Sequence, residues 1–154
     1  MASVEEVWAA FLEARPDLAG PATPPAAAWH FCDNQADADE LAELVLAGRK
    51  RATAGALWSY EAEDEPLPRP GDLSVITDWA GAAVCVIRTT AVDVVPFDEV
   101  PEEFAATEGE GDGSLAFWRE VHWAAFSREF EGTKRSAEPD MPVVCERFEV
   151  VYPG

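Results

Sequence analysis

Leu73-Ser74-Val75-Ile76-Thr77-Asp78-Trp79 and Val84-Cys85-Val86-Ile87-Arg88-Thr89-Thr90-Ala91-Val92 are two strand-like runs on either side of a turn at Ala80-Gly81. Both runs are rich in β-branched residues, and glycine allows the tight reversal between them. They predict a hairpin with arms at 73–79 and 82–95. A strand as long as the second arm usually bends or changes partners, as strands of small barrels do. The hairpin therefore predicts a curved or closed sheet.

One amphipathic helix is expected at the N-terminus. Ser3 and Glu6 have the spacing of a capping box, and apolar residues then recur at three- and four-residue intervals over about residues 4 to 14. A linker that contains Pro16, Pro21, Pro24 and Pro25 follows. Prolines so placed sustain neither a helix nor a strand ladder. The sequence predicts an N-terminal helix with a proline-rich strap at 1–28 and a main domain at 29–154.

A second helix and a second strand are expected between this linker and the hairpin. Residues 29–32 form a short extended piece, and the acidic run 37–43 begins a helix with an apolar face of Leu41, Leu44 and Val45. Gly48 can take the left-handed conformation that ends such a helix. Residues 52–58 are then expected to form a strand.

The C-terminal part alternates helical and extended patterns. Short helical pieces at 96–106 precede the acidic, glycine-rich loop 108–113, and apolar residues recur at helical spacing over 115–126. Residues 143–152 are expected to close the chain as a strand. Strands interleaved with unequal helices, around a dominant antiparallel hairpin, indicate an α+β fold.

Composition narrows the classes of function. The chain has 154 residues, suitable for one domain, and a formal net charge of -19. Nucleic-acid binding draws most of its affinity from cations that neutralise phosphates, so this charge disfavours DNA binding and nonspecific RNA binding. A phosphate-bearing partner would have to enter through a local basic patch.

The cysteines and the hydropathy of the chain indicate the cellular compartment of the protein. Cys32, Cys85 and Cys145 are widely spaced among apolar neighbours, without a Cys-x-x-Cys pair, so we expect three buried reduced thiols. The N-terminus lacks the pattern of a secretory signal, and no apolar run is long enough to span a bilayer. We therefore expect a cytoplasmic protein without a membrane partner.

A basic turn in an acidic chain is the first candidate site. Arg49, Lys50 and Arg51 follow Gly48, where cations face the negative end of the helix dipole, so helix termination alone explains part of this cluster. Lys50 and Thr53 are also three residues apart in a tight turn. This spacing could point an amine and a hydroxyl into one cleft.

Four motifs in order resemble the ASCH domain family over roughly residues 29 to 152. They are Gly48-Arg49-Lys50-Arg51-Ala52-Thr53, Pro68-x-Pro70-Gly71-Asp72, Glu108-Gly109-Glu110-Gly111-Asp112 with Trp118 and His122, and Cys145-Glu146-Arg147-Phe148. The resemblance implies a small PUA-like β-barrel of about five to six mainly antiparallel strands, flanked by three main helices. It also implies a cleft for RNA or nucleosides beside the Gly-x-Lys turn.

Two activities are known in that family. Some short bacterial members remove the acyl group from N4-acetylcytidine, with a lysine, a threonine three residues later and a glutamate after the central hairpin. The matching catalytic positions here are Lys50, Thr53 and, by its Ala-x-x-Glu spacing, Glu108. Another group resembles this chain in the Glu-Gly-Glu-Gly-Asp segment and includes a member described as a ribonuclease. Family membership does not choose between these reactions.

Amide hydrolysis needs a nucleophile, a base and a donor to the oxyanion. A neutral Lys50 could activate Thr53 if Arg49 and Arg51 lower its pKa, whereas Glu108 would raise that pKa. If Lys50 is charged instead, its ammonium group would contact an oxyanion or a phosphate. Glu108 would then be the better base to activate water. Both alternatives stay open.

The remaining candidates would line the cleft. We predict substrate-binding roles for Arg49, Arg51, Tyr60, Arg88 and His122, although His122 also fits a core position on its helix. The acids of the glycine loop could hold magnesium, but the ligand ladder of a calcium loop is absent, so no metal and no cofactor are expected.

Three functions remain in order of preference. The first is a hydrolase of an N4-acylcytidine-like amide, because a small neutral substrate tolerates the net charge of -19. The second is an RNA-binding protein or ribonuclease that uses the same cleft. The third is a non-enzymatic nucleotide-sensing domain.

Overall fold

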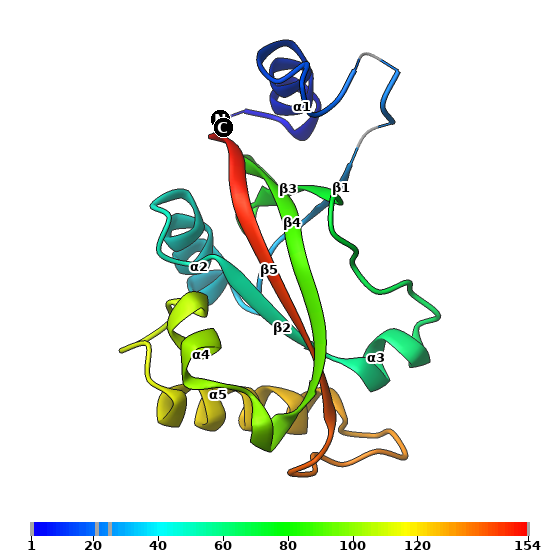
Figure 1. Ribbon diagram of the computed structural model, residues 1–154, viewed down its shortest axis with the longest axis vertical. Helices are drawn as coiled ribbons and strands as arrows, with labels where there is room; N and C mark the ends of the chain where they lie inside the picture. Colours follow the sequence, from blue (N-terminus) through cyan, green and yellow to red (C-terminus); the bar gives the residue numbers. More distant parts are fainter. Residues whose placement is uncertain (1, 21, 25, 154) are drawn as a thin grey trace.

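A curled five-stranded sheet in the order β1-β3-β4-β5-β2 is the centre of the computed structural model, which describes residues 2–20, 22–24 and 26–153. β1 (Ala27–Trp29) pairs in parallel with β3 (Leu73–Thr77), and the other neighbouring strands are antiparallel. In Figure 1 helices α2, α4 and α5 lie to the left of the sheet and below it, while α1 lies at its upper end. The expected α+β fold is confirmed.

The predicted hairpin, formed by β3 and β4, lies in the middle of this sheet. β4 (Ala83–Pro96) pairs along one edge with β3, up to Arg88, and along the other edge with β5 (Pro142–Pro153), from Cys85 to Pro96. Its register against β5 shifts between Val86 and Ile87 and again between Thr89 and Ala91. Bulges of this kind increase the local twist and bend the strand. The long second arm therefore bends, one of the two expected outcomes, while it keeps β5 as its partner throughout, and this curvature makes the sheet a half-barrel.

α1 (Val4–Ala14) has the predicted bounds, and the Ser3 hydroxyl accepts a hydrogen bond from the backbone N–H of Glu6. Its apolar face, with Phe11 fully buried, packs on Val75 and Val86 of the sheet. Pro21 and Pro25 of the expected strap lie outside the described residues. The division of the chain at residue 28 stays a prediction.

The next elements differ partly from expectation. α2 (Gln35–Leu46) begins at Asn34, and Gly48 has the left-handed φ of 80° expected of a helix end. β2 (Ala52–Ala56) is shorter than predicted, because α3 (Leu57–Ala62) replaces its last residues. This helix folds the Tyr60 ring back over Gly55, where a side chain would leave too little room.

The C-terminal elements follow the expected order. A 3-10 turn (Phe97–Glu99) precedes α4 (Glu102–Glu108), and α5 (Leu115–Glu129) extends three residues beyond the predicted periodicity. The Ser114 hydroxyl caps α5 by accepting from the N–H of Phe117. The described part of the chain holds five α-helices: the three main ones predicted, α4 within the short helical pieces expected at 96–106, and α3, which the sequence did not predict.

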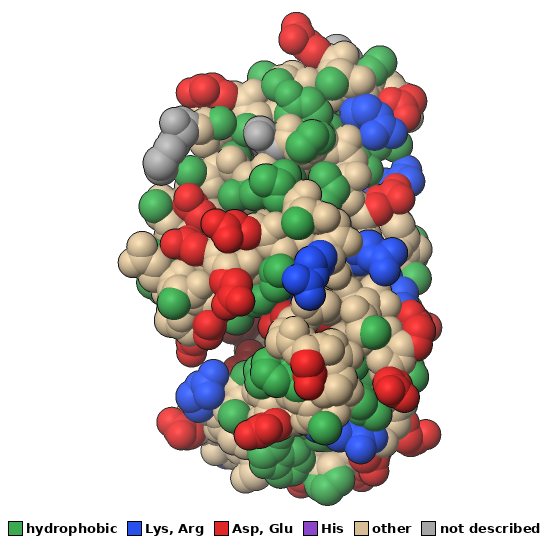
Figure 2. All heavy atoms as spheres, turned by 90° about the vertical axis from the view of Figure 1, so that its left-hand side faces the viewer, with side chains coloured by type: hydrophobic (Ala, Val, Ile, Leu, Met, Phe, Trp, Pro, Cys, Tyr) green, Lys and Arg blue, Asp and Glu red, His purple; other side chains and the backbone are tan. Residues whose placement is uncertain are grey.

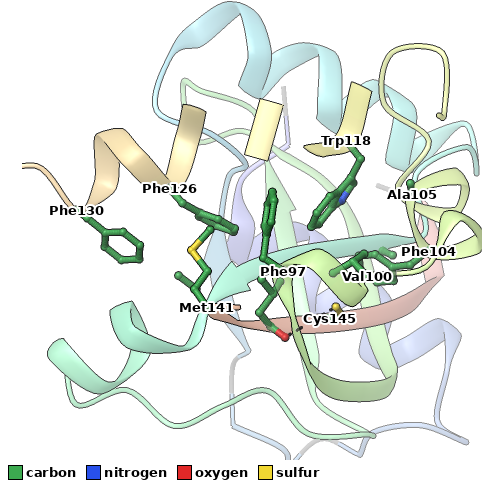
Figure 3. Packing of buried hydrophobic residues seen from close by; sticks show 12 residues of the cluster. Phe97, Val100, Phe104, Ala105, Trp118, Phe126, Phe130, Met141 and Cys145 are labelled. Carbon is green, nitrogen blue, oxygen red and sulfur yellow. Dashed lines mark hydrogen bonds between the residues drawn. The ribbon is translucent and has the colours of Figure 1, made fainter. Parts of the chain in front are cut away.

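An aromatic core joins α4 and α5 to the sheet. The rings of Phe97, Trp118 and Phe126 lie together between α5 and β5, with Phe97 5.4 Å from Trp118 and 6.4 Å from Phe126 between centroids (Figure 3). Met141 and Cys145 close this core from the strand side. The core fixes the position of Trp118, whose indole borders the polar cluster described below.

Two other expectations concern the cysteines and the membrane. Cys85 and Cys145 are buried free thiols as expected, but Cys32 is exposed, and its φ of 61° lies in the left-handed region. None of the helices in residues 2–20, 22–24 and 26–153 is long and apolar enough to cross a membrane.

Candidate active site

Lys50 lies in the interior with 1% of its surface exposed. Its Nζ donates to the carbonyl of Ala52 at 2.8 Å, to Oε2 of Glu110 at 2.9 Å and to Oε1 of Glu108 at 3.2 Å. An ammonium group has three hydrogens, and these three acceptors use them all. Burial alone would lower the pKa of Lys50, but the charges of Glu108 and Glu110 outweigh burial and raise it. Lys50 is therefore charged.

Glu108, the last residue of α4, is as deeply buried as Lys50. Its Oε2 accepts from the indole N–H of Trp118 and lies 3.2 Å from Nε2 of His122. Burial opposes its ionisation, yet the positive charges of Lys50 and His122 dominate and lower the pKa of Glu108. Both of its oxygens are engaged by donors, so Glu108 is an ionised structural acceptor and a weak base.

His122 completes the contacts of Glu108. Its Nδ1 lies 2.9 Å from the carbonyl oxygen of Trp118, which can only accept, so Nδ1 carries a proton. Its Nε2 faces the carboxylate of Glu108, and its ring stacks on that of Trp118 with 4.2 Å between centroids. Burial lowers the pKa of His122, but the charge of Glu108 more than reverses this and raises it. This geometry fits an imidazolium.

Glu110 is the member of the cluster that reaches the surface, with 18% of its side chain exposed. Lys50 holds its Oε2, while its Oε1 accepts from no described residue. Burial and the charge of Glu108 raise the pKa of Glu110, although Lys50 opposes them. A partly exposed carboxylate with a raised pKa and one oxygen available is the best placed base of the cluster.

The glycine-rich loop brings Glu110 back beside Glu108. Gly109 has a φ of 68° and ends α4, so the chain reverses there. A Cβ atom at Gly109 would overlap the carbonyl of Arg49, the residue before Lys50. The basic turn and the glycine loop are thus packed backbone to backbone, and only glycine permits this approach.

A pocket of about 240 Å³ opens beside Glu110. Its apolar wall consists of Leu41, Leu44, Phe117 and Val121, and its ionisable carboxylates are Asp37, Glu40 and Glu110. Figure 2 faces this side of the molecule and shows a hollow with acidic side chains at its margin. Cys32, although exposed at the surface, also lines the pocket, and partial burial of its thiol, with the charge of Glu110, raises the pKa of the thiol to about 11. The thiol is therefore not a nucleophile near neutral pH.

The structure separates two of the predicted site residues from this cluster. Thr53 and Tyr60 line another pocket, of about 490 Å³, on the concave face of the sheet. Ala52 and Ala54, the neighbours of Thr53 in β2, face the aromatic core instead. Because side chains alternate along a strand, Lys50 and Glu108 meet on one side of β2 while Thr53 points to the other.

The three predicted arginines lie on the surface. Arg49 and Arg51 are exposed on either side of buried Lys50. Arg88 forms an ion pair with Glu149 on the adjacent strand β5. Of the residues predicted to bind substrate, His122 is the one that the structure brings to the cluster, whereas Glu110 was considered in the sequence only as a metal ligand.

Glu108, Glu110 and His122 also have the spacing of metal ligands, with their ligand atoms within 4.8 Å of one another. The ammonium of Lys50, however, lies within 3.2 Å of both carboxylates. It supplies the positive charge that a metal would bring, and a divalent ion would meet its repulsion. The expectation of a metal-free site stays a prediction.

Comparisons with known proteins agree on one family. The family model of the ASCH domain matches residues 27–152. The ASCH domain structure from Lactobacillus crispatus JV V101 is 37% identical, with a TM-score of 0.84, and the match covers 96% of this chain and 95% of that one. Protein EF3133 from Enterococcus faecalis V583 is 34% identical, with a TM-score of 0.87, over 97% of this chain and 88% of that one. None of the curated proteins matches the chain.

Proposed function

Since this chain belongs to the ASCH domain family, we propose that it is a hydrolase that cleaves the amide bond of a small, uncharged, N4-acylcytidine-like nucleoside. The observation that carries the proposal is the buried Lys50–Glu108–His122 network, which holds the carboxylate of Glu110 at the edge of a pocket. Such a network around one partly exposed base is typical of a catalytic centre.

The lining and the volume of this pocket favour a small, uncharged substrate. Its ionisable carboxylates repel phosphates, and its lining contains no Lys or Arg among the described residues. Phe117 and Leu41 offer an apolar wall to a planar base. A volume of about 240 Å³ suits a base more than a polynucleotide. RNA cleavage, the alternative function, therefore has less support.

Each residue of the network has a chemical role in this proposal. Glu110 takes a proton from water, which attacks the amide carbonyl. The bond between the acyl carbon and N4 then breaks, the acyl group leaves as a carboxylic acid, and Glu110 returns the proton to the departing amino group of cytidine. Lys50 and Glu108 are positioning residues, since all their polar atoms are used within the network, and His122 balances the charge of Glu108. With all four groups ionised, two positive and two negative charges cancel. A lysine-activated Thr53 has no support in this geometry.

Hydrolysis of N4-acetylcytidine tests the proposal. Glu110→Gln keeps the size of the side chain but removes the base, so kcat should fall by about 10²–10⁴ with little change in KM. Glu13→Gln, an exposed change on α1, is the matched control and should retain activity. Thr53→Ala should also remain active if the site lies beside Glu110.

Four results would contradict parts of this proposal. Full activity of Glu110→Gln would exclude Glu110 as the base. Loss of activity only in Thr53→Ala would move the site to the concave pocket. Cleavage of a short labelled RNA, with inert N4-acetylcytidine, would favour the ribonuclease, whereas nucleoside binding without turnover would favour a sensing domain.

A further inference from the structure

The concave face of the half-barrel contains a second pocket, of about 490 Å³, that the proposed hydrolase does not use. Each strand of the sheet contributes to it, and Tyr60 of α3 with the segment 65–72 closes its side. The interior of a small curled sheet is usually filled by apolar side chains. Here the lining is only partly apolar, and it also contains hydroxyls and carboxylates, among them those of Thr53, Ser74, Thr89, Asp72 and Glu146.

Glu146 is the central group of this pocket. Only 7% of its surface is exposed, and its Oε2 accepts from the hydroxyl of Thr89 at 2.6 Å. No lysine, arginine or histidine of the described residues forms an ion pair with it, in contrast to Glu108. Burial raises the pKa of Glu146, against the hydrogen bond from Thr89. A buried carboxylate without a counter-charge is costly unless a ligand supplies one.

The surroundings of Glu146 suit a positive ligand. Glu65 and Asp72 are exposed acids at the mouth of the pocket, and its lining contains no Lys or Arg among the described residues. Burial raises the pKa of Tyr60 to about 12, so its ring is a neutral phenol. Aromatic faces beside carboxylates attract organic cations.

We propose that this pocket binds a small organic cation with a primary amine or guanidinium group, and that Glu146 is its counter-ion. A volume of about 490 Å³ is within the range of small-molecule sites and far exceeds the need of a bare metal ion. The N–H groups of the cation would donate to the carboxylate of Glu146 and to the hydroxyl oxygens around it. The acids at the mouth would favour its entry.

Calorimetric titration with agmatine tests this site. The uncharged 1,5-pentanediol serves as a probe of similar length. Agmatine should bind saturably to the wild type, one molecule per chain, and pentanediol should not bind. Glu146→Gln should weaken agmatine binding by about tenfold or more, because the charge of a buried pair is removed. Glu13→Gln removes the same charge from exposed α1 and should leave the affinity within about twofold of wild type, because exposed charges are screened.

Two further variants test the site independently of Glu146→Gln and of the proposed hydrolase activity. Thr89→Val removes the hydroxyl that orients Glu146, so it should also weaken binding if Glu146→Gln does not fold. Glu110→Gln, inactive under the proposed function, should bind agmatine as the wild type does, which separates failure of one proposal from failure of the other. The proposal is overturned by absent saturation, by equal binding of pentanediol, by equal loss in Glu13→Gln, or by displacement of agmatine by cytidine.

Discussion

A lysine that is 1% exposed must be neutral or fully paired, because an isolated charge in the interior is prohibitively unfavourable. Lys50 is paired, with three oxygen acceptors arranged around its ammonium group. The sequence left its protonation state open, since the flanking arginines and Glu108 act in opposite directions. The structure resolves the competition: Arg49 and Arg51 point to solvent, and the two carboxylates lie at hydrogen-bond distance.

Lys50→Met should lower the free energy of unfolding by roughly 3–5 kcal/mol, because it leaves buried Glu108 without its counter-charge. The double variant Lys50→Met/Glu108→Gln should recover part of the loss, since no unpaired buried charge remains at Glu108. Urea denaturation at neutral pH measures both. A single variant within about 0.5 kcal/mol of wild type would contradict the charged, paired state of Lys50.

His122 should make stability depend on pH. Its pKa is raised in the folded protein, so its contribution is fully present below the unfolded value near 6.5 and is lost as pH rises through the folded value. The difference in unfolding free energy between wild type and His122→Gln should therefore be largest near pH 6 and shrink at higher pH. Urea denaturation across this range measures it. A difference that grows with pH would show that His122 is neutral beside Glu108.

The glycine loop and the basic turn are in direct contact through their backbones. Gly48 and Gly109 both have positive φ, at 80° and 68°. A Cβ atom at Gly109 would overlap the carbonyl of Arg49, whereas a Cβ atom at Gly48 would meet no atom within 4 Å. Each glycine ends a helix, and the two helix ends meet at Lys50 and Glu108. The cluster thus depends on two left-handed residues far apart in the sequence.

Gly48→Ala and Gly109→Ala form a matched pair that isolates this contact. Gly48→Ala should cost about 1–2 kcal/mol, the strain of a left-handed alanine. Gly109→Ala should cost clearly more and also lower hydrolysis, because the loop must move away from Arg49 and carry Glu110 with it. Urea denaturation and the N4-acetylcytidine assay measure the two effects. Equal destabilisation by both changes would rule out the close approach.

Elements with a clear period were predictable with nearly correct bounds, whereas the short helix α3 was not predicted. α1 and α5 repeat apolar residues over several turns, and the hairpin alternates over long arms, so their bounds were nearly right. α3 has six residues without a buried face, and the sequence placed its first two residues in a strand. The Tyr60 ring of this helix packs over Gly55 of β2, a contact that local propensity does not predict.

The whole molecule carries a net charge of -19, while its internal cluster is neutral when all four groups are ionised. Its negative charges therefore lie mainly at the surface, where they repel one another and are open to screening. This field favours small neutral or cationic ligands over polyanions, in both pockets alike.

Salt should stabilise the protein for the same reason. Raising NaCl from about 0.02 M to about 0.5 M should increase Tm by a few degrees, because it shortens the range of repulsion. Calorimetry or circular dichroism measures the shift. Near the sequence pI of about 4.2 the same addition should have little effect, which serves as the control. A Tm independent of salt at neutral pH would mean that surface repulsion does not limit stability.

The sequence by itself determined the α+β class, the hairpin, the long helices and membership of a PUA-like family, because these depend on local periodicity and on motifs in order along the chain. It also identified Lys50, Glu108 and His122 as candidates. The tertiary structure alone decided that Glu110 lies at the pocket, that Thr53 faces the opposite side of β2, and that Glu146 lies without a counter-charge from any described residue. Those facts depend on which way a side chain points and on contacts between residues up to 60 positions apart, such as that of Lys50 with Glu110. Local sequence patterns do not contain them.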